Sequence, residues 1–140
     1  LGGRVNERLV AAELAASLET ISDPDLRVYP FPPDQLAAPA AIVGFPELIE
    51  FDVSAGRGVD RMTIPIYVVI DRTWDRSSAD QFANLTAGSG PNSVKQVVQT
   101  KPHSAFSTAR VRSVDRSVIS VAGVEFWAAT FLVDITGSGS

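Results

Sequence analysis

In residues 62–71, which read MTIPIYVVID, every second side chain is a large apolar one, and the side chains between them are Thr, Pro, Tyr, Val and Asp. Successive side chains of a strand point to opposite faces of its sheet, so every second residue shares a face. Pro65 has no N–H to donate, and we therefore expect an edge strand or a bulge at this position. The residues that share the apolar face are Met62, Ile64, Ile66, Val68 and Ile70.

The rest of the chain predicts a sheet of several strands around this one. Ala122-Gly123 fits the two-residue turn of a hairpin. The stretch after it, Val124–Ile135, is apolar on both faces, which is typical of a central strand covered on each side. The other predicted strands are Leu26–Tyr29, Ala40–Phe45, Leu48–Val53, Ala105–Val114 and Ser117–Val121.

Three helices are expected, at Asn6–Thr20, Ser77–Leu85 and Ser93–Thr100. Apolar residues recur at helical spacing in the first of them. The order of elements predicts an α+β fold: a mixed, mostly antiparallel sheet flanked by an N-terminal helix and two short middle helices. We expect one domain over residues 1–136, and a flexible glycine-serine tail over 137–140.

Composition excludes several classes of function. The chain has 140 residues, of which 45% are hydrophobic and 20% charged, as in an ordinary globular domain. It has no cysteine, which excludes disulfides, thiolate metal sites and a cysteine nucleophile. Sixteen acidic residues against twelve basic ones give a net charge of −4, which disfavours sequence-independent DNA binding. No apolar run approaches the ~20 residues that span a bilayer, so no membrane partner is expected.

A search for catalytic or cofactor-binding residues finds none. The single histidine, His103, follows Pro102 in a predicted loop, and no residue pattern suggests a catalytic triad or a zinc site around it. The segment 56–58, Gly-Arg-Gly, is too short for a phosphate-binding fingerprint. We therefore predict that the protein is not an enzyme and has no catalytic, cofactor-binding or metal-binding residues.

Two other segments allow a binding site or an ordinary structural feature. Gly88-Ser89-Gly90 precedes a helix, where an anion could bind, but a turn followed by a helix cap is the favoured interpretation. Asp71, Asp75 and Asp80 surround two arginines, Arg72 and Arg76. They could bind a hard cation, although charges at a strand-to-helix junction also suit a solvated surface.

Two groups of residues are candidates for contacts between subunits. Arg110 and Arg112 recur at period two with Phe106 and Thr108, which indicates either a solvated face or an interface. The predicted loop at Ser54–Asp60 is either a flexible hairpin loop or a contact with a neighbouring molecule. The candidate interface residues are Gly56, Arg57, Gly58, Arg110 and Arg112.

The order and spacing of several stretches between Val5 and Asp134 resemble the tail terminator (tail-tube completion) proteins of long-tailed bacteriophages, especially those of actinobacterial hosts. The resemblance lies in the Ala/Leu helix ending before Arg27-Val28-Tyr29, the proline crossover into residues 38–44, residues 49–52 with the Gly-Arg-Gly loop, Ile64-Pro65-Ile66, residues 88–95, and the strand 123–134.

This resemblance implies a mixed sheet with helices on its faces and a structural role without catalysis. Such proteins form hexameric rings at the head-proximal end of the tail tube, end its polymerisation and join it to the head connector. The implied partners are the major tail tube protein and the head–tail connector protein, with DNA passing through the lumen without specific binding. The implied location is the tail or neck of the virion, assembled in the host cytoplasm. Alternatives are a head-completion or neck connector subunit, or a small α+β ligand-binding domain or enzyme.

Overall fold

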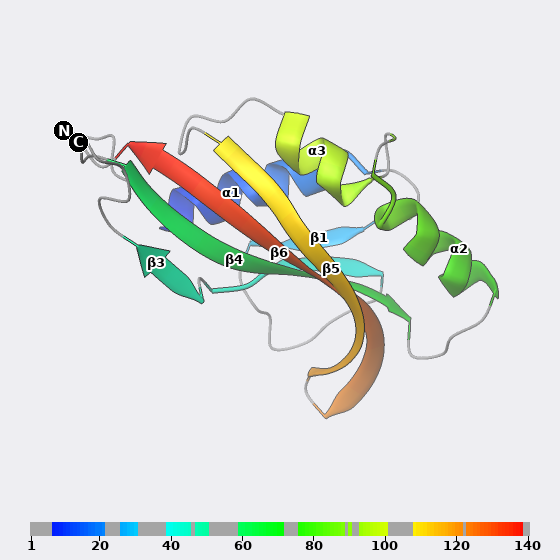
Figure 1. The fold of residues 1–140 in the computed structure, drawn as a ribbon. Helices are drawn as coiled ribbons and strands as arrows, with labels where there is room; N and C mark the ends of the chain where they lie inside the picture. Colours follow the sequence, from blue (N-terminus) through cyan, green and yellow to red (C-terminus); the bar gives the residue numbers. More distant parts are fainter. Residues whose placement is uncertain are drawn as a thin grey trace.

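The computed structural model describes residues 7–21, 26–30, 39–45, 47–50, 59–71, 76–88, 90, 93–100, 108–121 and 123–138. These residues form one sheet with three helices (Figure 1). The strands are β1 (Arg27–Tyr29), β2 (Ala40–Val43), β3 (Leu48–Glu50), β4 (Val59–Asp71), β5 (Thr108–Val121) and β6 (Val124–Ser138). The helices are α1 (Glu7–Leu18), α2 (Arg76–Leu85) and α3 (Val94–Thr100).

The strand order in the sheet is β1-β2-β4-β6-β5, and β3 pairs with β4 beyond the end of β2. β1 and β2 are parallel, and every other pairing of the described strands is antiparallel. The predicted α+β fold with a mixed, mostly antiparallel sheet is therefore confirmed. β6 lies between β4 and β5, as the apolar character of its two faces predicted.

The main core lies between the helices and one face of the sheet. The apolar face of residues 62–70 is at most 3% exposed, and it packs against side chains from all three helices, among them Leu14, Leu85 and Val98. Burying each such side chain stabilises the fold by about 1.5–3 kcal/mol. The described helices thus cover a single face, here called the helix face. The other, the open face, carries no helix from the described residues.

Pro65 lies inside the sheet, so the expectation of an edge strand or a bulge at this residue is wrong. The strand beside it changes at this point: β2 ends opposite Ile66, and β3 begins opposite Thr63. The N–H of Gly44 donates to the Pro65 carbonyl oxygen at 2.8 Å. Since N and C=O of one residue face the same neighbour in an antiparallel ladder, the missing donor of Pro65 faces the break between β2 and β3.

Several boundaries differ from the prediction: the second strand, for example, ends at Val43 and not at Phe45. β5 is one continuous strand where two were expected, because Asp115 and Arg116 pair with Thr130 and Ala129 and carry the ladder across the expected gap. A bulge between Val111 and Ser113 adds an extra residue within the first expected strand. β4 begins at Val59 and β6 runs to Ser138, which lies opposite Val59. Pairing between these two strands thus extends the sheet into the expected loop at Ser54–Asp60 and into the expected tail at 137–140.

The β5–β6 hairpin extends past the rest of the sheet and curves strongly (Figure 1). The last residue of β4, Asp71, pairs with Trp127, so the residues beyond it on β5 and β6 pair only with each other. Gly123 turns the hairpin with φ +80°, a conformation that glycine adopts without strain. Phe126 anchors this arm in a second apolar cluster on the open face, which includes Ile42 and Val69.

Candidate subunit-contact surface

Four strands, β3, β4, β6 and β5, lie side by side along one row of paired residues, which we call a level of the sheet. Position 48 lies opposite Thr63, Thr63 opposite Asp134, and Asp134 opposite Arg110. Met62 and Ile64, the neighbours of Thr63, belong to the helix-face core. Because side chains alternate along a strand, Thr63, Asp134 and Arg110 belong to the open face. Polar side chains therefore line the open face at the end of the sheet opposite to the curved β5–β6 hairpin.

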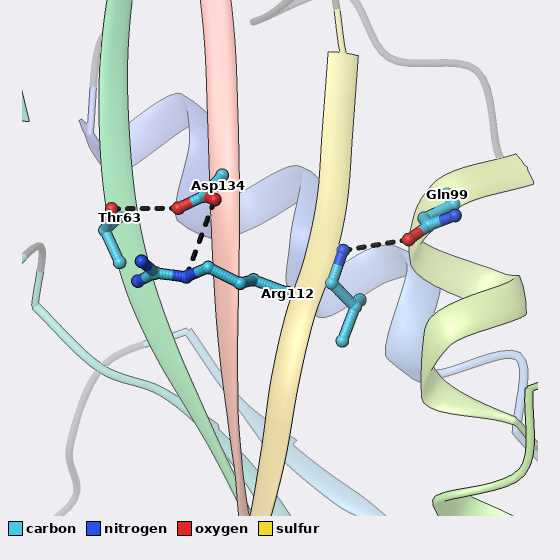
Figure 2. A network of polar contacts seen from close by, with 5 residues as sticks. Thr63, Gln99, Arg112 and Asp134 are labelled. Carbon is cyan, nitrogen blue, oxygen red and sulfur yellow. Dashed lines mark hydrogen bonds and ion pairs between the residues drawn. The ribbon is translucent and has the colours of Figure 1, made fainter.

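Asp134 joins three strands through two interactions (Figure 2). The Thr63 hydroxyl donates to Asp134 Oδ1 at 3.0 Å, and Arg112 Nε lies 3.6 Å from Asp134 Oδ2. The Thr63 side chain is 6% exposed, so its hydroxyl needs a partner. Arg112 is half exposed, and an ion pair of this kind contributes at most about 1 kcal/mol.

The two candidate arginines have different surroundings. Arg112 occupies the bulge of β5, and its side chain extends across β6 toward Asp134 (Figure 2). Arg110 is the direct cross-strand neighbour of Asp134 and is exposed. Within the described part of the chain, the Arg110 side chain makes no ion pair. Arg112 therefore belongs to a contact within the molecule, whereas the guanidinium of Arg110 can bind a partner from outside.

The outer edge of β5 is partly occupied by the chain itself. The N–H of Val111 donates to Gln99 Oε1 at 2.8 Å, a contact between β5 and α3 (Figure 2). An unpaired strand edge would otherwise be open to pairing with another chain. The N–H of Val111 is therefore not open to pairing with another chain.

The opposite edge carries two residues that the sequence did not single out. Phe45 follows β2 and is 69% exposed, and Glu47 precedes β3 and is also exposed. The N–H of Glu47 donates to the Thr63 carbonyl oxygen at 2.8 Å, which fixes this bend against β4. Burial raises the pKa of the Tyr67 hydroxyl, and the negative charge of Glu47 raises it further. This edge thus presents an exposed aromatic side chain and an exposed carboxylate, two residues apart in the sequence.

The other predicted sites fall into two groups. Gly88 and Gly90 lead into a helix cap: Ser93 Oγ accepts from the N–H of Gln96 at 3.2 Å, and Gln96 Oε1 accepts from the N–H of Gly90 at 2.7 Å. These contacts favour a turn followed by a cap over an anion site. Gly56, Arg57, Gly58, Arg72, Asp75, His103 and Phe106 lie outside the described residues. Among the residues described, no three acidic or histidine side chains gather as a cation site.

No protein-family model matches this chain, and no curated protein matches it either. In the part of the chain that the structure describes, no helix is long and apolar enough to cross a membrane.

Proposed function

We propose that this chain is a ring-forming structural subunit of a phage tail, and that it acts as the tail terminator. Two lines of reasoning support the proposal. The first is the resemblance in the order and spacing of sequence motifs to that family. The second is that the two edges of the sheet expose different side chains, Arg110 on one and Phe45 with Glu47 on the other.

This difference between the edges is the observation that carries the proposal. A ring of identical subunits needs a head-to-tail contact, in which one surface of each copy meets a different surface of the next. A two-fold dimer would instead require one self-complementary patch. Opposite edges that carry opposite charges at the same level of a sheet suit the first arrangement.

In this role the ring would add to the last layer of the tail tube and occupy the surface on which another layer would assemble. Its other face would then be available to the head connector. The net charge of −4 disfavours binding to DNA phosphates, which suits a passage through which DNA moves.

The experiment is a tube-growth assay with the major tail tube protein that we propose as the partner of this chain. We expect tubes grown with the chain to be shorter than tubes grown without it, and to carry the chain at one end only. Tubes of unchanged length without the chain at their ends would contradict the proposal. Binding to the head connector with no binding to tubes would indicate a neck connector subunit instead.

A further inference from the structure

We propose that Arg110 of one copy pairs with Glu47 of the next copy, and that Phe45 packs within the same contact. This inference rests on the proposed ring, and it names the two surfaces that close the ring. The partner is therefore a second copy of this chain.

The first argument is the position of the two charges in the sheet. Glu47 binds the backbone of Thr63 on one edge, and Arg110 lies in the same level of the ladder on the other edge. Three strand spacings of about 4.8 Å put these edges roughly 14 Å apart. This distance is far longer than an ion pair, so Arg110 and Glu47 of one molecule cannot pair with each other. A rotation that relates neighbouring copies about an axis along the strands instead places the β5 edge of one copy against the Glu47 edge of the next.

The second argument is charge complementarity. β5 carries three arginines and one aspartate, a net charge of +2 in a chain whose net charge is −4. Arg112 has a partner within the chain in Asp134, which leaves Arg110 as the positive group that faces outward at this level. A basic strand edge therefore matches the edge that carries Glu47.

The third argument concerns the strength of the contact. An exposed ion pair alone contributes at most about 1 kcal/mol. Phe45 is 69% exposed, and burying an aromatic side chain of this kind contributes about 1.5–3 kcal/mol. Large aromatic residues and arginine often dominate the binding energy of interfaces. Because Gln99 already occupies the N–H of Val111, the next copy cannot pair with that group, and side chains such as these can supply the contact.

The test is a charge exchange with four variants: Arg110→Glu, Glu47→Arg, the double variant, and Arg76→Glu as a control. Arg76 is exposed on α2, on the helix side of the sheet, so its reversal makes the same charge change away from the contact. Assembly is followed by sedimentation over a concentration series and by binding to tube ends. Each single variant should weaken assembly about tenfold or more, because it places like charges together. The double variant should restore assembly, and the control should assemble normally.

Single variants that assemble as well as the wild type would overturn this contact while leaving the ring itself intact. A double variant that stays as defective as the single ones would overturn the pairing of Arg110 with Glu47. A wild-type protein that never assembles, alone or on tubes, would instead contradict the proposed function. Melting curves of each variant at dilute concentration separate loss of assembly from loss of folding.

Discussion

Arg110 and Arg112 illustrate what a sequence pattern can and cannot predict about a site. Their alternation predicted that both would share one exposed face of a strand, and both do reach the open face. The bulge, however, lets Arg112 alone pair with Asp134, and a bulge depends on pairing with a distant strand. Phe45 and Glu47 were missed because they lie in a bend without periodicity, where exposure depends on how β2 and β3 meet β4.

Tyr67 reports on the position of Glu47. A carboxylate near a phenol disfavours the phenolate, so Glu47→Gln should lower the pKa of Tyr67 toward its ordinary value of 10.0. The measurement is an ultraviolet absorbance titration in a Tyr29→Phe background, which leaves Tyr67 as the tyrosine observed. Glu19→Gln, an exposed change after α1, is the control and should leave the titration unchanged.

The raised pKa of Tyr67 also contributes to how stability depends on pH in the alkaline range. The folded-state pKa lies above the unfolded value, so this contribution to stability is complete below the unfolded pKa and is lost as pH rises through the folded pKa. If Tyr67 titrates identically with and without the Glu47 carboxylate, the carboxylate does not lie close to Tyr67, and its placement at this edge of the sheet is wrong.

At the scale of elements, local pattern predicted the strands well and their neighbours poorly. The alternation in residues 62–70, the central position of β6 and the turn at Gly123 all have local signals, and these three predictions are confirmed. The expectation that β6 would be covered on each side is not confirmed, because the described helices lie on one face of the sheet. The interior position of Pro65 and the continuity of β5 depend on which strands pair, and a single sequence does not encode that locally. Pro65 is accommodated because the neighbouring strand is interrupted beside it.

Close packing at that interruption predicts a requirement for glycine at position 44. A Cβ on Gly44 would lie 2.9 Å from Pro65 Cγ and 3.1 Å from the Pro65 carbonyl oxygen. That oxygen also accepts the N–H of Gly44, so neither group can move aside without disturbing β4. We expect Gly44→Ala to lower the free energy of unfolding by about 1–3 kcal/mol in denaturant titrations.

Gly88→Ala is the matched control, because a Cβ there would meet no atom within 4 Å. It should change stability by no more than about 0.5 kcal/mol. Equal stability of the two alanine variants would show that the end of β2 is less closely packed against β4 than described.

The described part of the molecule has two layers, with helices on one face of the sheet and no described helix on the open face. The resemblance implied helices on the faces of the sheet, whereas the described helices share a single face. A domain of this length has a radius of gyration of about 14 Å and behaves like a ball roughly 37 Å across. Six such balls touching in a ring leave a hole on the order of 35 Å, which is wide enough for a DNA duplex.

The most direct test of the ring is electron microscopy of the purified chain bound to the ends of tail tubes, with end-on views averaged without imposed symmetry. We predict a closed ring of six subunits at one end of each tube. Free rings are expected at high protein concentration, while monomers predominate in dilute solution because the tube completes the contacts. Bound protein with another symmetry, or a bound monomer that never closes a ring, would contradict the account.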